Sequence, residues 1–162
     1  RGKGAVRYDL RGRGLTVAVT AKLIDALFPP WRQVIAHDPT TAITCGATRL
    51  SEAFAAALKF ASDRTHGVRF EANGAVRIST NDPDRGEFAE VLRDARKVGG
   101  DAAVGLDARY AISAIRGLGD GDVRVDLWGE LDAILLRTAD AADTQPNGIP
   151  GGRFAVVMPM RI

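Results

Sequence analysis

The secondary structure that this sequence predicts occurs twice in the same order. One strand, one helix and three strands span residues 42–94, and a second unit of the same order spans residues 102–159. An internal duplication of this kind constrains the fold more than any single motif does. It predicts an α+β domain in which two helices cover one side of packed antiparallel sheets.

In the first unit, a helix is expected at 48–61, with Thr48 as its N-cap. Its apolar residues fall on one face: Leu50, Phe54, Ala57, Leu58 and Ala61. The strands of this unit are expected at 42–46, near 67–72, near 75–80 and near 86–94. Asn73-Gly74 joins the second and third of these, and this dipeptide is the strongest short signal for a hairpin.

In the second unit, Asp107 is expected to cap a helix that runs to about Arg116, with Gly117 as its stop. Ala108, Ile112 and Ile115 face inward in this prediction. The strands of this unit are expected at 102–106, 122–128, 131–138 and 153–159, the last two separated by a loop at 139–152.

A hairpin is predicted before the duplicated region. Val6–Leu10 and Leu15–Thr20 alternate between apolar and polar residues, and Arg11–Gly14 joins them as a tight turn. Phe28-Pro-Pro-Trp31 then breaks any regular element, because proline fixes φ and removes a donor. We place a domain boundary there. An isolated hairpin is at best marginally stable in water, so this one needs a sheet supplied from elsewhere.

The positive charge of the chain is concentrated at its start. Residues 1–13 carry a net +4, and the whole chain carries +2, so the remaining residues sum to −2. A basic stretch of this kind is either an arm for nucleic acid or the solvated end of a strand, and we favour the second interpretation.

The sequence shows no arrangement that is typical of an enzyme or a metal site. His37 and His66 have no Cys, Asp or Glu at ligand spacing, so both are interpreted as loop residues. Cys45 has no local histidine and is expected to be a buried structural thiol. The 117–122 segment is interpreted as a turn, and the carboxylates of Asp82 and Asp84 as partners of the local backbone. We therefore expect a non-catalytic protein without cofactor or metal.

The sequence also predicts the cellular compartment of the protein. A single cysteine excludes an internal disulfide and suits a reducing cytoplasm. No leader segment opens the chain, and no apolar run approaches the roughly 18 residues of a membrane span. A soluble, cytoplasmic protein is expected.

Two surface features could carry a binding function. The second helix presents Arg109, Ser113 and Arg116 to solvent, and the first helix has basic residues on or beside its solvent face: Arg49, Lys59 and Arg64. Such faces are more often merely solvated than bound to DNA. The second feature is the apolar run Val156–Met160, which is either a closing core strand or one side of an adaptable apolar pocket.

Four segments of the chain resemble motifs of the bacterial replication sliding clamp, the β subunit of DNA polymerase III. They are Lys22–Ile35, Glu52–Ala55 with His66–Phe70, Val104–Tyr110 and Phe154–Ile162. The last of them, Phe-Ala-Val-Val-Met-Pro-Met-Arg-Ile, is close to the terminal signature of that family.

The resemblance implies a DNA-clamp (processivity) fold and a division of the chain into two domains. Residues 1–30 would be the terminal hairpin of the clamp's middle domain, and residues 31–162 its complete C-terminal domain. It also implies the function. Clamp subunits associate into a ring that encircles double-stranded DNA without sequence specificity, and they dock short peptides of the polymerase and the clamp loader at the replisome.

Site residues follow from the resemblance by position. The peptide-binding pocket would comprise Pro29, Val34, Tyr110, Leu131, Ala133, Val156, Val157, Met158, Pro159, Met160 and Arg161. The residues facing DNA would be Arg49, Lys59, Arg109 and Arg116. Lys59 and Phe60 would lie at the subunit interface.

Two readings of the chain's length remain open. The chain is either a fragment of a longer clamp, whose middle domain would complete the pocket, or a short clamp-like protein. In the second case it would bind partners without forming a ring around DNA. An unrelated α+β enzyme is the third possibility, and the missing catalytic constellation disfavours it.

Overall fold

A computed structural model of the chain describes residues 4–27, 30–35, 38–140 and 151–162. The chain divides into two compact units, Arg1–Pro30 and Trp31–Ile162. Each unit is described on its own, and we call them the hairpin unit and the main unit.

The hairpin unit contains strands β1 (Ala5–Gly12) and β2 (Leu15–Lys22), which pair antiparallel. This confirms the predicted hairpin. Gly14 takes a positive φ of 73° in the turn, a conformation that glycine adopts without strain. One face of the ribbon is apolar, since Tyr8 lies opposite Val19 and Leu10 opposite Val17, and all four side chains are exposed.

The main unit contains a short 3₁₀ turn, η1 (Trp31–Val34), and the helices α1 (Ala47–Leu58) and α2 (Ala108–Leu118). Its strands are β3 (Thr41–Gly46), β4 (Gly67–Asn73), β5 (Ala75–Asp82), β6 (Gly86–Val91), β7 (Arg96–Gly99), β8 (Ala102–Asp107), β9 (Asp122–Leu127), β10 (Ile134–Thr138) and β11 (Phe154–Val157). The strand, helix and three-strand order therefore occurs twice, as predicted, with β7 added between the repeats.

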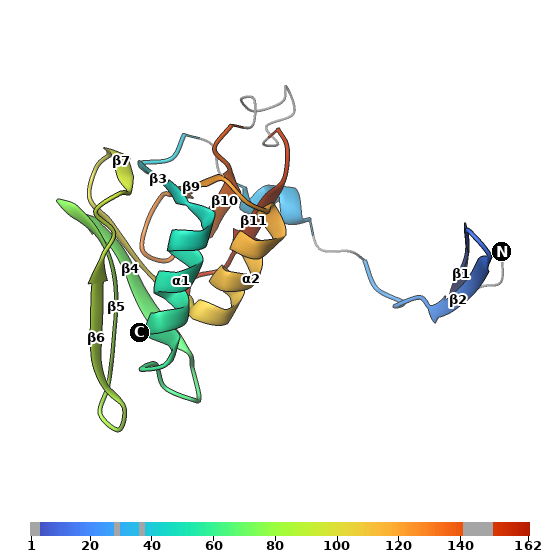
Figure 1. The fold of residues 1–162 in the computed structure, drawn as a ribbon, viewed down its shortest axis with the longest axis horizontal. Helices are drawn as coiled ribbons and strands as arrows, with labels where there is room; N and C mark the ends of the chain where they lie inside the picture. The colour runs from blue at the N-terminus through green and yellow to red at the C-terminus, as the bar shows by residue number, and fades with distance from the viewer. Residues whose placement is uncertain (1–3, 28–29, 36–37, 141–150) are drawn as a thin grey trace. The chain divides into compact units, whose positions relative to one another are not determined.

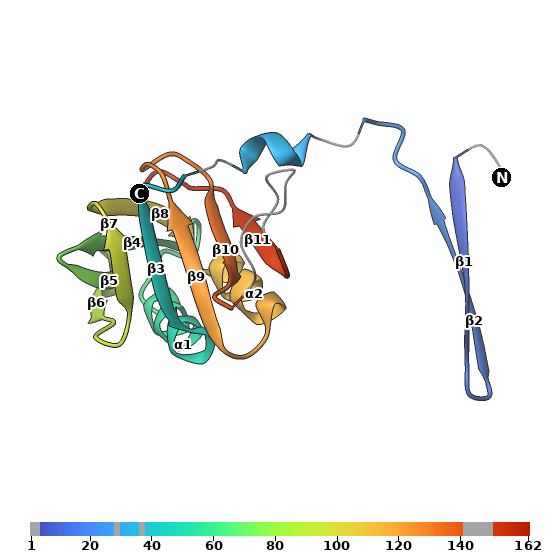
Figure 2. The same ribbon diagram turned by 90° about the horizontal axis from the view of Figure 1, so that it is seen from above.

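The strands form two antiparallel sheets, ordered β11-β10-β9-β3-β7 and β6-β5-β4-β8. The helices lie side by side: α1 packs on β3, β4, β5 and β6, and α2 packs on β8, β10 and β11 (Figures 1 and 2). This is the α+β arrangement that the duplication predicts. It places one long side of α2 next to β11 and the end of the chain.

The first strand of each repeat is exchanged into the sheet of the other repeat. β3 pairs with β9, and β8 pairs with β4. The first residue of each helix also bonds to the other repeat. The Ala47 N–H donates to the Gly121 carbonyl at 2.7 Å, and the Ala108 N–H donates to the His66 carbonyl at 3.0 Å. Each repeat therefore depends on the other for its hydrogen bonds.

The core lies between the helices and the two sheets. Its largest fully buried side chains come from both repeats and include Ile43, Leu50, Phe54, Phe70, Ile78, Leu106, Ile115 and Leu136. Of the apolar face predicted for the first helix, Leu50, Phe54 and Ala57 are buried within α1, and Leu58 is half-buried. Cys45 is buried as predicted, and burial raises the pKa of its thiol.

The predicted start and end of α1 were wrong. Thr48 is exposed inside the helix, Gly46 occupies the N-cap without a side-chain bond, and the helix ends at Leu58 rather than Ala61. β3 runs directly into the helix at Gly46, so Thr48 lies inside α1 and not at its cap. The Gly121 carbonyl accepts from the Ala47 N–H, so one of the first helical N–H groups is satisfied by the other repeat.

The predicted cap of α2 is confirmed, but its predicted end was wrong. Asp107 accepts a hydrogen bond from the Arg109 N–H at 2.9 Å. The helix continues through Gly117 to Leu118 and ends at Gly119, whose φ is 92°. Leu118 is 2% exposed, and burying it outweighs the roughly 1 kcal/mol that a glycine costs inside a helix.

Strand limits also differ from the predictions. β7 was missed because it is short and lies at the edge of its sheet, paired with β3 alone. β10 begins at Ile134 rather than 131, since residues 130–132 form a turn and a bend. β11 ends at Val157 rather than 159, and Pro159 has no N–H to continue the ladder. The Asp82 carboxylate accepts from the N–H groups of Asp84 and Arg85, as expected for that turn.

Candidate functional site

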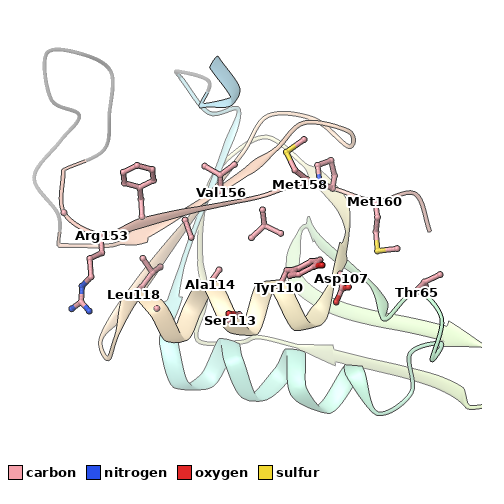
Figure 3. Close-up of a pocket in the computed structure, with 16 residues that line it drawn as sticks. Thr65, Asp107, Tyr110, Ser113, Ala114, Leu118, Arg153, Val156, Met158 and Met160 are labelled. Carbon is pink, nitrogen blue, oxygen red and sulfur yellow. The ribbon is translucent and has the colours of Figure 1, made fainter. Parts of the chain in front are cut away.

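A cavity of about 970 Å³ lies between α2 and the C-terminal end of the chain. Figure 3 shows the helix along one side and the chain from Arg153 to Met160 along the other. We call this cavity the tail groove, and residues 158–162 the tail.

The helical side of the groove is one face of α2. The residues that line it are Tyr110, Ser113, Ala114, Gly117 and Leu118, which follow the i, i+3, i+4, i+7, i+8 spacing of a single face. The opposite face of α2 is buried in the core through Ala108, Ile112 and Ile115. The groove therefore uses the side of the helix that the sheets leave uncovered.

The other side of the groove is formed by β11 and the start of the tail. β11 is fixed by its pairing with β10, where Val157 lies opposite Ile134 and is buried. Beyond it, the Met160 N–H donates to the Gly105 carbonyl in β8 at 2.9 Å. The chain is thus held on both sides of Pro159.

The groove is largely apolar and open to solvent. Tyr110 and Met158 are 64% and 61% exposed, so both present apolar surface to solvent along the groove. Polar side chains are few: Thr65 and Asp107 lie near one end, Ser113 lies along the helix, and Arg153 lies near the other end (Figure 3). This combination suits a ligand with an apolar anchor and a defined direction.

The charge of Asp107 is held in place by Arg109. The carboxylate accepts from the Arg109 backbone N–H and from its guanidinium, at 2.6 Å from Nη2. Burial alone would raise the pKa of the Asp107 carboxyl, but the hydrogen bonds from Arg109 outweigh it and lower the pKa below its ordinary value. Arg109 also lies 5.9 Å from the centre of the Tyr110 ring.

Replacing Asp107 by alanine should lower the free energy of unfolding by about 1 kcal/mol near neutral pH, because the helix loses its cap. The folded pKa lies below the ordinary value of 3.8, so this carboxylate stabilises the fold above that pH. Its contribution is lost as the pH falls through the folded pKa. Urea unfolding at several pH values should therefore show the difference between wild type and variant shrinking in acid.

Asp107→Asn is the matched control for this prediction. It keeps a capping acceptor but cannot ionise, so it should retain most of the stability, and its difference from Asp107→Ala should not depend on pH. A difference between wild type and Asp107→Ala that stays constant down to about pH 3 would contradict the assignment.

The structure brings together six of the eleven residues predicted for the pocket: Tyr110, Val156, Val157, Met158, Pro159 and Met160. Val34, Leu131, Ala133 and Arg161 do not line the tail groove. Val34 and Leu131 are exposed, Ala133 is half-buried, and Arg161 lines a separate cavity on β4 and β5. Pro29 lies outside the described residues.

The sequence reasoning missed several lining residues. Ser113, Ala114 and Leu118 share the spacing of Tyr110 along α2, so the helical period could have identified them once Tyr110 was chosen. Thr65 could not have been found this way, because it reaches the groove from the loop before β4.

The residues predicted to face DNA differ in their partners. Arg49 is paired with Glu90 at 2.6 Å, and Arg109 is paired with Asp107. Arg116 and Lys59 are exposed, and neither forms an ion pair with another described residue. Their charges are therefore the more available ones.

The residues predicted at the subunit interface lie where α1 ends. Lys59 is the C-cap residue of α1, and its carbonyl accepts from Arg85 at 3.4 Å. Phe60 is 37% exposed and stacks on Phe88 of β6, with ring centroids 5.5 Å apart. An aromatic pair is thus partly exposed near the β6 edge of the four-stranded sheet.

No helix in the part of the chain that the structure describes is long and apolar enough to cross a membrane. Among the same residues, no group of three or more His, Cys, Asp or Glu is placed to hold a metal ion. His66 has a positive φ of 52° and is half-buried, and His37 lies outside the described residues.

Comparison with known proteins gives a consistent result. Residues 32–151 match the family model described as the DNA polymerase III beta subunit, C-terminal domain. A beta sliding clamp of Proteus mirabilis is 29% identical over 145 residues, which cover 88% of this chain and 36% of that protein. The Escherichia coli K12 beta sliding clamp is 28% identical over 144 residues, covering 88% and 37%. The chain therefore spans little more than a third of the length of these relatives.

Solved structures show the same fold. The DNA polymerase III subunit beta from Pseudomonas aeruginosa is 25% identical, with a TM-score of 0.79 over 99% of this chain and 40% of that one. A DnaN sliding clamp from Bartonella birtlesii, crystallised with griselimycin bound, is 22% identical, with a TM-score of 0.81 over 99% and 40%. At that identity, the second comparison supports the fold alone.

Proposed function

This chain belongs to the DNA polymerase III beta subunit family, matching its C-terminal domain, and we propose that it acts as part of a replication sliding clamp. The match of residues 32–151 is the observation that carries the proposal. In this proposal the complete protein is a non-catalytic processivity factor of the cytoplasmic replisome. It self-associates into a ring and keeps the polymerase on duplex DNA by enclosing the duplex.

The tail groove is the proposed docking site for short peptides of the polymerase and the clamp loader. Its apolar walls and exposed Tyr110 and Met158 suit an apolar peptide side chain, and the polar groups at its ends suit the peptide backbone. The proposed contacts are the six predicted residues that line the groove. Pro29, Val34, Leu131, Ala133 and Arg161 stay predictions of the resemblance.

The proposed contacts with DNA are electrostatic and independent of sequence. Arg116 and Lys59 would contact phosphates directly. The charges of Arg49 and Arg109 are partly neutralised by their ion pairs with Glu90 and Asp107, so their attraction to phosphate would be weaker. Weak contacts of this kind are compatible with sliding. The Phe60 edge, beside Lys59, is the proposed contact with the next subunit.

The hairpin unit is proposed to be the end of the clamp's middle domain. The apolar face that carries Tyr8, Leu10, Val17 and Val19 is exposed in this chain, and a two-stranded ribbon is at best marginally stable alone. The rest of a middle domain would extend the ribbon into a sheet and cover that face.

The docking proposal is tested with a fluorescent peptide that carries the clamp-binding segment of a DNA polymerase III. Tyr110→Ala and Met160→Ala should each weaken its binding to the 162-residue chain by about tenfold or more, because each removes apolar surface from one wall. Fluorescence anisotropy measures the affinities.

Val98→Ala is the matched control for the docking test. Val98 is 73% exposed on β7, at the opposite edge of the sheet from β11, so its removal should leave the affinity unchanged. Equal affinities for wild type, Tyr110→Ala and Met160→Ala would show that the peptide does not use the tail groove.

A further inference from the structure

We propose that two glycines outside the main wall of the groove, Gly105 in β8 and Gly67 in β4, are positioning residues for the peptide site. Resting on the proposed docking function, this inference concerns how the Met160 side of the groove is held. The two glycines lie on the same face of the four-stranded sheet, since Gly105 pairs with Arg69, two residues after Gly67. That face is the one opposite to the buried Val68 and Phe70.

Gly105 is the point at which the backbone of the tail touches the sheet. A Cβ at this position would lie 2.3 Å from the Met160 carbonyl oxygen and 2.8 Å from Cγ1 of Ile162. The hydrogen bond from the Met160 N–H to the Gly105 carbonyl joins the same two residues. Any side chain larger than hydrogen would therefore push the tail away. The atom it would meet first is the backbone carbonyl oxygen of Met160.

Gly67 receives the side chains of the tail. A Cβ there would lie 2.8 Å from Cγ2 of Ile162 and 3.6 Å from Cε of Met160. In contrast to Gly105, the closest atom belongs to a side chain and would disappear if Ile162 were shortened. The two glycines thus make different contacts with the same tail.

The backbone itself does not require glycine at either position. Neither residue has a positive φ, so a larger residue would fit the strand if the tail were absent. Gly100, by comparison, also lacks a positive φ and has no neighbour within 4 Å of a built Cβ. The contact with the tail is therefore the feature that distinguishes Gly105 and Gly67.

The consequence for the groove runs through Met160. Met160 lines the cavity next to Thr65 and Tyr110, and it is the residue hydrogen-bonded to Gly105 (Figure 3). Val157 is buried in the core and would stay in place. If the tail were lifted from the sheet, the part of the chain that follows Pro159 would move, and Met160 would move with it. The groove would lose one end of its apolar wall while α2 and β11 stayed in place.

The test compares Gly105→Ala, Gly67→Ala and the control Gly100→Ala, each also combined with Ile162→Ala. The first measurement is independent of any peptide. The chain has two methionines, so a chain labelled with ¹³C in the methionine methyl groups gives two resonances, which Met158→Leu assigns. Gly105→Ala and Gly67→Ala should move the Met160 resonance, and Gly100→Ala should move neither.

The second measurement is the affinity for the fluorescent polymerase peptide. Gly105→Ala and Gly67→Ala should each weaken peptide binding by about tenfold, and the control Gly100→Ala should weaken it by less than about twofold. Ile162→Ala should restore the binding of Gly67→Ala but not that of Gly105→Ala, because the latter meets the Met160 carbonyl. A merely structural role would not give this selective rescue. If Gly105→Ala fails to fold, the binding of Gly67→Ala and its rescue by Ile162→Ala still test the proposal.

The proposal is overturned if the Met160 resonance is unchanged in Gly67→Ala and Gly105→Ala, or if Ile162→Ala rescues neither or both. A wild-type chain that binds no peptide would instead refute peptide docking at the tail groove of this chain. The methyl spectra would then decide by themselves whether the two glycines position the tail.

Discussion

Replacing Asp126 by alanine should lower the free energy of unfolding of the main unit by about 3–5 kcal/mol. Asp126 lies in β9, is 2% exposed, and accepts hydrogen bonds from Nε of Arg124 at 2.7 Å and from Nε of Arg137 at 2.9 Å. The two arginines are direct cross-strand neighbours, so the carboxylate of Asp126 compensates two like charges that face each other. Urea denaturation followed by circular dichroism measures the loss.

Two controls define the cause of this loss. Asp126→Asn keeps the shape and removes the charge, so it should fall between wild type and Asp126→Ala. Asp122→Ala removes an exposed carboxylate from the same strand, whose partner Arg96 is 3.5 Å away, and should change stability by less than about 0.5 kcal/mol. If Asp126→Ala were no more destabilising than Asp122→Ala, the ion cluster would not hold β9 and β10 together.

The second large effect is expected from Phe54→Ala, at about 3–5 kcal/mol of unfolding free energy. Phe54 is 2% exposed and joins α1 to β4 through Phe70, with ring centroids 5.7 Å apart. The substitution removes the apolar surface and leaves a cavity between a helix and a sheet, which the close-packed core can fill only in part. Thermal and urea unfolding should both report the change.

Phe54→Leu and Phe60→Ala are the controls for that prediction. Phe54→Leu fills most of the space and should cost clearly less than the alanine variant. Phe60 stacks on Phe88 but is 37% exposed, so its removal should cost less than half as much as the removal of Phe54. Equal losses for Phe54→Ala and Phe60→Ala would show that the core does not centre on Phe54.

The repeated order of elements could be predicted because its signals are local. The helical faces of α1 and α2, the Asn73-Gly74 turn and the Asp107 cap each depend on residues close together in the sequence. The exchange of β3 and β8 could not be predicted, because it is a choice of distant partners that no periodicity encodes.

The candidate site was only partly accessible to sequence reasoning. The residues from Val156 to Met160 and Tyr110 were chosen through the resemblance to the clamp family, and the structure brings them into one cavity. The pairing of Arg49 with Glu90 was not foreseeable, since 41 residues separate them and a helical wheel shows only a basic residue facing solvent. The contact of Gly105 with the tail is likewise a matter of tertiary distance.

The exchanged first strands have a consequence for how such a domain can exist at all. One repeat alone would offer an unpaired edge of its sheet, together with a first strand that has no sheet to enter. A second copy could satisfy both needs by swapping strands, but that association would depend on concentration. Joining the two repeats in one chain makes the swap intramolecular, so the effective concentration of each half for the other is set by the linker and not by the solution.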